Sequence, residues 1–352
     1  MKKTKNLLTA GRRDYLISFG IVILAFAVVQ TMILTGNITS SLKGQLVPIC
    51  AYIVMAVSLN LTVGILGELS LGHAGFMSVG AFAGIVVTTS LADVIPFAPL
   101  RLALAMIVGG LLAAVAGVII GVPVLRLKGD YLAIVTLAFG EIIKSVINCV
   151  WVSVDGSKLA FAFNSNNVPG KILINGPQGA VKVDKIATFT GGFLLVLFAL
   201  LVIMNLVHSH TGRAIMASRD NRIAAESVGI SVMKYKTIAF VTSAVLAGMA
   251  GALYGLSIYT FAPSKFDFNQ SINVLVFIVL GGIGNLVGGM ISATVLTILP
   301  EKLRAFNDYR MLAYAVVLIL VMIATNSRSV KNFVSSLTAP LKKARKGDAE
   351  HA

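Results

Sequence analysis

The sequence GELSLGHAGF, residues 67–76, interrupts a chain that is otherwise strongly apolar. An apolar run lies on either side, at 46–66 and 74–91. Each is long enough to cross a ~30 Å hydrocarbon layer, which takes about 20 residues of helix. A glycine-rich interruption that holds a glutamate and a histidine indicates two spans joined by a surface turn or by a break inside the membrane. The length arithmetic favours the turn, and both interpretations stay open.

The composition is typical of a membrane protein. Of 352 residues, 57% are hydrophobic and 12% are charged, and the mean hydropathy is +0.90. Soluble domains carry roughly 25% charged residues, and the ten-residue alternation of a transmembrane barrel is missing from the sequence. We therefore expect an all-α, polytopic transmembrane helical bundle of about 8–10 spans. The clear spans are 15–35, 46–66, 74–91, 101–124, 131–151, 190–208, 237–258 and 310–325.

One further apolar segment, 271–299, carries a glycine-rich interruption from Gly281 to Gly289. It forms either one long span or two short helices that turn back at the sequence GGIGN. A second glycine-rich stretch, AGMAGALYG at 247–255, has the small-x-x-x-small spacing that is typical of closely packed membrane helices.

Basic residues predict the orientation and the division of the chain. With the N-terminus inside and 271–299 folded as a helix pair, most of the 29 lysines and arginines fall on the cytoplasmic side. This predicts a basic N-terminus at 1–14, a transmembrane domain at 15–325 and a basic tail at 326–352, with both termini cytoplasmic. The first span reads as uncleaved. The formal charge of +15 gathers at span ends, which argues against a nucleic-acid partner.

Two connecting loops are long. The outer loop, 152–189, is rich in Asn, Gly and Lys, whereas the inner loop, 208–236, contains helix-forming residues. The inner loop reads either as short cytoplasmic helices or as a solvated connector. Cys50 and Cys149 both lie in apolar segments, so no disulfide is expected. The histidines have no metal-ligand spacing with cysteine or acidic residues, so no metal site is expected.

The inner loop carries a family resemblance. Its sequence SRDNRIAAESVGISVMKYK resembles the cytoplasmic coupling loop of bacterial ABC importer permeases, most closely the branched-chain amino acid permeases of the LivM type. The importer pattern Glu-Ala-Ala-x-x-x-Gly aligns with Ile223, Ala224, Ala225 and Gly229, with isoleucine in place of the glutamate. The stretches RLKGDYLAIVTLAFGEIIK and APSKFDFNQSINVLVFIVLGGIGNLVGG resemble the same family, relative to which 152–174 looks like an insertion. The resemblance assigns contact with ATPases to Arg219, Asp220, Arg222, Ala224, Ala225, Glu226 and Gly229.

The resemblance implies a non-enzymatic transport subunit of the bacterial cytoplasmic (inner) membrane. Its implied partners are a second permease, two ABC ATPases that bind ATP and Mg, and an extracytoplasmic binding protein. The chain itself contains no Gly-x-x-x-x-Gly-Lys-Ser/Thr loop, so no cofactor is expected in it. The implied substrate is a branched-chain or related hydrophobic amino acid. Permeases for urea, short amides, ribose or nucleosides are alternatives within the superfamily.

Polar residues inside or beside the spans are the candidates for the transport path and its gate, because such residues are costly in a membrane unless they face protein or water. An ion-coupled secondary transporter is the rival class, and Glu141 is the carboxylate inside a span that it would use. Glu141 and Lys144 lie on one helical face and can pair, as a path wall or as a structural contact. The candidates are Glu68, Ser70, His73, Glu141, Lys144, Asn273 and Asn285.

Overall fold

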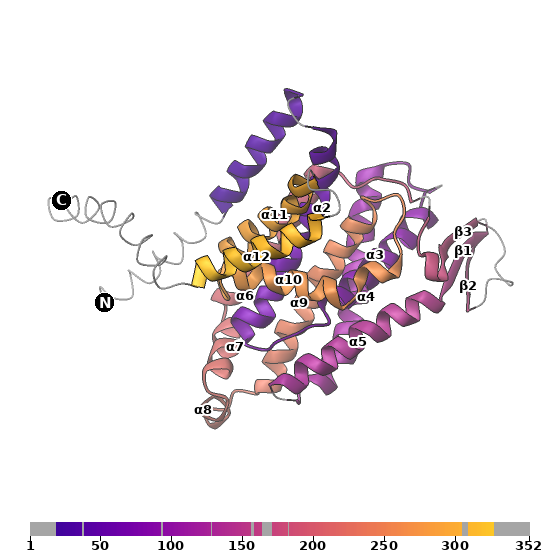
Figure 1. Ribbon diagram of the computed structural model, residues 1–352. Helices are drawn as coiled ribbons and strands as arrows, with labels where there is room; N and C mark the ends of the chain where they lie inside the picture. Colours follow the sequence, from indigo (N-terminus) through magenta and orange to yellow (C-terminus); the bar gives the residue numbers. More distant parts are fainter. Residues whose placement is uncertain are drawn as a thin grey trace. The chain divides into compact units, whose positions relative to one another are not determined.

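The protein is described by a computed structural model, shown in Figure 1. It divides into two compact units, residues 1–294 and 295–352, which we describe separately. The described residues are 19–36, 39–92, 94–127, 129–155, 158–163, 171–181, 183–304 and 309–326.

The first unit is mostly helical. A helix at Phe19–Leu34 comes first and stacks Phe26 on Phe193 of α6. The helices that follow are α2 (Ser40–Asn60), which continues as the π-helical turn η1 (Leu61–Leu66), α3 (His73–Ser90), α4 (Ala98–Val124), α5 (Asp130–Cys149), α6 (Phe189–His208), α7 (His210–Asp220), α8 (Arg222–Ser227), α9 (Val232–Gly255), α10 (Phe268–Gly281) and α11 (Leu286–Lys302), whose end belongs to the second unit.

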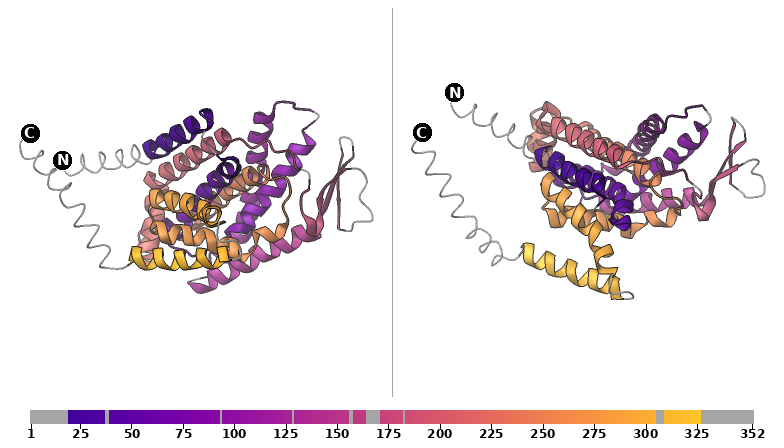
Figure 2. Two further views of the ribbon diagram at one scale, coloured as in Figure 1. Left: turned by 45° about the horizontal axis from the view of Figure 1, so that its top comes forward. Right: turned by 90° about the horizontal axis from the view of Figure 1, so that it is seen from above.

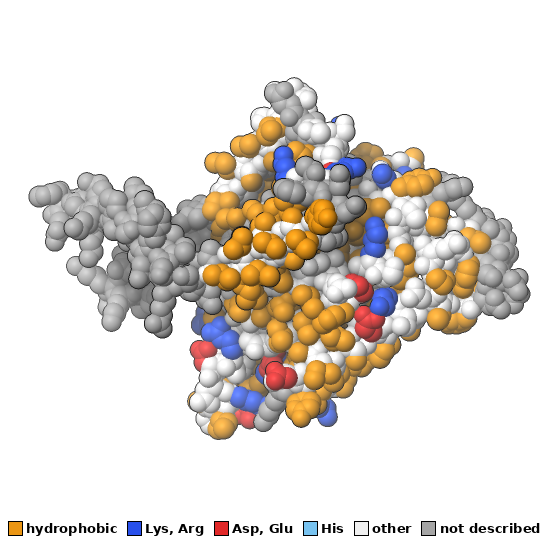
Figure 3. All heavy atoms as spheres, in the orientation of Figure 1, with side chains coloured by type: hydrophobic (Ala, Val, Ile, Leu, Met, Phe, Trp, Pro, Cys, Tyr) orange, Lys and Arg blue, Asp and Glu red, His pale blue; other side chains and the backbone are white. Residues whose placement is uncertain are grey.

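Six helices in the described ranges are long and apolar enough to cross a membrane, which agrees with a multi-pass protein. They are Ser40–Leu66, His73–Ser90, Ala98–Val124, Asp130–Cys149, Phe189–His208 and Val232–Gly255. Three shorter apolar helices, Phe19–Leu34, Phe268–Gly281 and Leu312–Ile323, fall where the sequence predicts further spans. Along the edge formed by α5, Figure 3 shows hydrophobic side chains, and Tyr131 and Ile134 there are well exposed.

Helix α9 is the centre of the core, where it packs against α2, α3 and α4. Glycines allow this approach: a Cβ on Gly251 would overlap the Met77 carbonyl, and one on Gly80 would overlap the Gly248 carbonyl. Close packing of backbones through small residues is a common source of helix association in membranes. The prediction that the glycines of 247–255 serve packing is therefore confirmed for Gly248 and Gly251.

The segment 271–299 forms two helices, as one of the two interpretations predicts. Helix α10 ends at Gly281 and α11 begins at Leu286. Gly282 and Gly284 adopt positive φ values of 91° and 84°, which side chains rarely tolerate. Their backbone conformation makes the break possible.

A small sheet lies where the sequence predicts a long outer loop. Strands β1 (Trp151–Asp155), β2 (Lys158–Ala162) and β3 (Lys171–Asn175) pair antiparallel in the order β2-β1-β3. The sheet projects from the end of α5 in every view of Figures 1 and 2. The all-α fold class is thus correct for the bundle but misses these strands, which make up most of the expected insertion 152–174. Bridges Ile174–Ala180 and Ala180–Phe261 anchor them to the loop after α9.

The second unit contains the end of α11 and helix α12 (Arg310–Asn326). Helix α12 agrees with the predicted span 310–325. Its apolar side chains are largely exposed within the chain, for example Leu312 at 64% and Ile323 at 61%. The basic segment 1–14 and nearly all of the tail 326–352 lie outside the described residues.

The glycine contacts of α9 give a test of the packing. We expect Gly251→Ala to lower the free energy of unfolding by about 2 kcal/mol, because the added methyl group would overlap backbone atoms of α3. Gly44→Ala is the matched control, since no atom lies within 4 Å of its added Cβ and alanine favours helix. Thermal unfolding in detergent would compare them. Equal melting temperatures for the two variants would contradict this packing.

Candidate functional site

The polar stretch after α2 begins with an irregular helix end. The last turn, Leu61–Leu66, is π-helical, and π-helical turns are frequent at functional sites. Gly67 then ends the helix with φ 80°, and its N–H and that of Glu68 both point to the carbonyl of Thr62. A Cβ on Gly67 would lie 2.6 Å from Cγ of Arg219. Glycine is therefore required here both by its φ and by the side chain that covers it.

The residues after Gly67 run back beside α2 before α3 begins. His73, the first residue of α3, is fully packed inside the protein, and its Nε2 lies 2.8 Å from Oγ of Ser58. Ser58 lies about two helical turns before the end of the α2–η1 helix at Leu66. Residues 67–72 thus form a non-helical return segment, which we call the return segment from here on.

Residues 67–72 separate two helices, Ser40–Leu66 and His73–Ser90, that are each long enough to span a membrane, as the length arithmetic expects. Whether this segment is a surface turn or a break inside the membrane stays a prediction. Side chains support the backbone here: the N–H of Leu71 in the return segment donates to Oγ1 of Thr136 at 3.0 Å, and the N–H of Ala74, in the first turn of α3, donates to Oγ of Ser271 at 3.2 Å. Such partners are needed wherever backbone is removed from water.

The break between α10 and α11 meets the helix end before the return segment. Oδ1 of Asn60 accepts a hydrogen bond from the N–H of Gly284 at 2.9 Å. A Cβ on Gly64 would lie 2.5 Å from the same nitrogen, so glycine lets the two breaks touch. Asn285 caps α11 by accepting from the N–H of Gly288 at 3.1 Å. We call this contact of Asn60 and Gly64 with Gly284 the junction of the two breaks. Asn273 is half-buried within α10 and is not part of it.

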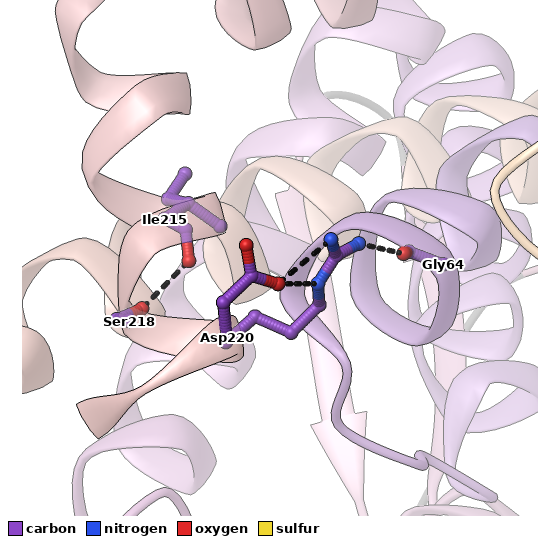
Figure 4. A network of polar contacts seen from close by, with 5 residues as sticks. Gly64, Ile215, Ser218 and Asp220 are labelled. Atoms are coloured by element: carbon purple, nitrogen blue, oxygen red, sulfur yellow. Dashed lines mark hydrogen bonds and ion pairs between the residues drawn. The ribbon is translucent and has the colours of Figure 1, made fainter.

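Two cations also reach this place from the inner loop. Nη1 of Arg219, at the end of α7, donates to the carbonyl of Gly64 at 3.0 Å. Its Nε and Nη2 both donate to Oδ1 of Asp220, as Figure 4 shows. Lys236, in the first turns of α9, forms an ion pair with Glu68, and both side chains are nearly buried. The structure therefore brings Glu68, a pathway candidate, and Arg219, a coupling-loop candidate, to the same helix end.

A cavity of about 430 Å³ opens beside these contacts. Its walls come from η1, from α6 and α7, and from the break between α10 and α11. Arg219 and Asn285 are its polar side chains together with His208, and Met204 and Met216 are among its apolar ones. The volume falls within the range of small-molecule sites.

The inner loop is helical rather than a solvated connector. Asn221 caps α8 by accepting from the N–H of Ala224 at 3.0 Å. Gly229 ends it with φ 84°, and the N–H of Ile230 returns to the carbonyl of Ala225 at 3.0 Å. These are standard caps at both helix ends. Helix α8 is thus a short but well-defined element.

Helix α8 turns nearly all of its side chains to solvent. Ala225 is buried against the bundle, whereas Ile223 is 81% exposed and Val228, just after the helix, is 74% exposed. Arg222 and Glu226 pair across one helical turn at 2.9 Å on the exposed surface. Two large exposed apolar side chains, one on this short helix and one just after it, are typical of a surface that a partner covers.

Glu141 and Lys144 form the predicted ion pair on α5. Oε1 of Glu141 also accepts from the N–H of Phe268 at 3.2 Å, at the beginning of α10. A carboxylate at a helix N-terminus is favourable, so the pair fastens α5 to α10. It lies apart from the junction of the two breaks.

The junction and the ion pair beside it also contain residues that were not among the sequence candidates, namely Asn60, Gly64, Gly284 and Lys236, and Ser58 nearby was not a candidate either. Asn60 carried a usable signal, because an amide inside an apolar span is costly unless it has a partner. Lys236 carried a weaker one, since it stands at a span end where basic residues are common.

The family description "Branched-chain amino acid transport system / permease component" matches residues 41–325. The matched range contains both helix breaks, the return segment and the inner loop. The chain belongs to this permease family. No solved structure matches it.

Known permeases resemble the chain over most of its length. The high-affinity branched-chain amino acid transport system permease protein LivM of Escherichia coli is 33% identical over 306 residues, which cover 77% of this chain and 66% of that protein. LivM of Salmonella typhimurium is 34% identical over 286 residues, with the same coverage. The chain therefore spans just under two thirds of the length of both relatives. The ribose import permease protein RbsC of Escherichia coli is 27% identical over 287 residues, 78% of this chain and 82% of RbsC.

The contact between the two breaks gives a second test. We expect Asn60→Leu to lower the free energy of unfolding by about 1–3 kcal/mol, because the N–H of Gly284 would lose its partner. Asn273→Leu is the matched control on α10, where the side chain is half-buried. Thermal unfolding of both variants in detergent would measure the difference. If Asn60→Leu unfolded no earlier than the control, the hydrogen bond would not hold the breaks together.

Proposed function

We propose that this chain is a membrane permease subunit of an ABC importer, driven by separate ATPases that bind ATP and Mg. The capped, solvent-facing helix α8 is the observation that carries the proposal. Its ends are fixed by Asn221 and Gly229, so it moves as a unit, and it presents Ile223 and Val228 to a partner. The family match supports the same assignment.

The substitution of isoleucine for glutamate in the importer pattern fits an apolar contact at this position. A salt bridge from residue 223 to an ATPase is excluded by its chemistry. Ile223 instead offers a side chain whose full burial would contribute about 1.5–3 kcal/mol to binding. Arg222 and Glu226, which pair with each other, would surround this contact with charge.

We assign the binding protein to the end of the bundle that carries the sheet. The sheet β1–β3 and the loop after α9 are joined through Ala180 and Phe261 and would form one docking surface for an extracytoplasmic binding protein. A second permease completes the proposed importer. We place the complex in the bacterial cytoplasmic (inner) membrane with both termini of this chain inside, as the distribution of basic residues suggests.

The proposed substrates are branched-chain or related hydrophobic amino acids. The similarity to LivM proteins supports them, at higher identity than the similarity to RbsC. Permeases for ribose, nucleosides, urea or short amides remain the alternative within the superfamily. The carboxylate that an ion-coupled transporter would use, Glu141, is engaged with Lys144 and the N–H of Phe268, which favours the importer.

Uptake into proteoliposomes tests this function. We expect the complex with its co-encoded partners to take up leucine, isoleucine or valine when ATP is supplied, and to ignore a proton uncoupler. Ribose, urea and a nucleoside complete the panel and would reveal the alternatives. Uptake that needs no ATP and stops with the uncoupler would contradict the importer and indicate a secondary transporter.

The exposed apolar side chain of α8 gives a separate test of ATPase docking. We expect Ile223→Asp to weaken ATPase binding about tenfold or more. The substitution removes a favourable apolar contact and would place a charged carboxylate in the interface. Ile223→Leu is the matched control and should bind like the unaltered chain. Copurification and a binding titration in detergent would measure both. Equal affinities for the two variants would place the docking contact elsewhere.

A further inference from the structure

Helix α8 is flanked in the sequence by two cations that reach the same short stretch of chain. Arg219 precedes α8 and bonds to Gly64, and Lys236 follows it and pairs with Glu68. The stretch from Gly64 to Glu68 is the irregular end of the α2–η1 helix, where the return segment begins. The proposed ATPase contact is therefore attached to the helix break on both of its sides.

The contact of Arg219 fixes the position of α7 relative to the end of the α2–η1 helix. At the end of a helix the last carbonyls have no helical donor, and the guanidinium of Arg219 supplies one to Gly64. The aliphatic stem of Arg219 lies over Gly67, where a Cβ would be 2.6 Å away. Oδ1 of Asp220 accepts hydrogen bonds from Nε and Nη2, at another edge of the guanidinium, at 3.0–3.1 Å. A displacement of the end of α7 would therefore shift the carbonyl of Gly64 and the backbone of Gly67 with it.

The lysine contact is a nearly buried ion pair. The side chains of Lys236 and Glu68 are 10% and 14% exposed. Buried pairs add little net stability, but removing one partner is strongly unfavourable. The pair therefore fixes the spacing between the beginning of α9 and the return segment, more than it strengthens the fold.

Buried polar atoms lie on both sides of the stretch that these cations hold. Nδ2 of Asn60, Oγ1 of Thr62 and Oγ of Ser70 are buried without a hydrogen-bond partner in the described part of the chain. Buried polar atoms normally have partners, and exceptions call for an explanation. Three of them lie within eleven residues, so these residues have side-chain groups that can form further hydrogen bonds if their arrangement changes.

We propose that Arg219 and Lys236 are positioning residues that transmit the movement of α8 to the helix break. In this proposal, which rests on the importer function above, the ATPases displace α8, and the two cations carry Gly64 and Glu68 with it. The return segment and, through Asn60, the break at Gly284 then change their arrangement. Gating is thus assigned to the junction of the two breaks.

The test compares transport with ATP hydrolysis in the reconstituted importer. The variants are Arg219→Met, which keeps the stem and loses the donors, and the double variant Glu68→Gln with Lys236→Met, which leaves no buried charge. We expect assembly and ATP hydrolysis to persist while uptake of amino acid per ATP falls about tenfold or more, the usual range of coupling between sites. This ratio separates transmission from a merely structural role.

Two controls change the same residue types on the same helices. Arg213 bonds to the carbonyl of His208 and the ring of His210 within its own segment, and Lys234 is exposed. Arg213→Met and Lys234→Met should keep the normal uptake per ATP. If they lowered the ratio as much as Arg219→Met, loss of charge alone would explain the effect and the proposal would be overturned.

Charge exchange provides the second measurement. Glu68→Lys and Lys236→Glu should each lower uptake per ATP, because each leaves two like charges together in a nearly buried site. Combining them restores the ion pair with reversed polarity and should restore most of the ratio. Failure of the combination to recover any coupling would count against the pair.

The outcomes distinguish the junction from the importer function. A normal ratio in Arg219→Met and in the neutral double variant would overturn the proposal and leave the importer intact. A parallel fall of assembly, hydrolysis and uptake would also overturn it, because the residues would then be structural. If the unaltered complex showed no ATP-dependent uptake of any panel member, the importer function and this proposal would both fail.

Discussion

The structure depends on one constraint, which is that backbone polar groups removed from water need partners. Residues 67–72 leave α2 without helical bonds and pass back into the bundle, so neighbouring elements must supply their partners. Thr136 of α5 does so for the N–H of Leu71, and Ser271 of α10 does so for the N–H of Ala74 in the first turn of α3. Because the partners come from distant helices, the break ties the path of the chain to the packing of the whole bundle.

The same requirement brings the second break to the first. The N–H of Gly284 lies outside any helix and finds its acceptor in Asn60, an amide placed inside an apolar span. The carbonyl of Gly64 finds its donor in Arg219. These two backbone groups are thus satisfied by side chains from other elements, and the result is a junction that links the α2–η1 helix, α7 and the α10–α11 break. Such a junction responds when any one of these elements moves.

The sequence predicts the elements of this fold better than their contacts. Span length and hydropathy locate six long helices, and the glycines of 281–289 locate the break between α10 and α11. The pairing of Glu141 with Lys144 follows from helical spacing alone. The pairing of Glu68 with Lys236 does not, because it joins residues 168 positions apart through tertiary packing. The strands β1–β3 were missed for a different reason, which is that their segment is rich in Asn, Gly and Lys and that its apolar alternation is short.

The distribution of rigid and irregular contacts determines where motion from α8 can go. Helix α9 begins just after α8, but it packs on α3 and α4 through glycines whose neighbours are backbone atoms, as at Gly251 and Gly80. Close-packed interiors resist continuous deformation. The η1 turn and the return segment lack regular α-helical bonding, and Oγ1 of Thr62 and Oγ of Ser70 are buried there without a hydrogen-bond partner among the described residues. A displacement that enters through Arg219 and Lys236 therefore changes the junction before it changes the core, which is the property that a gate beside a fixed scaffold requires.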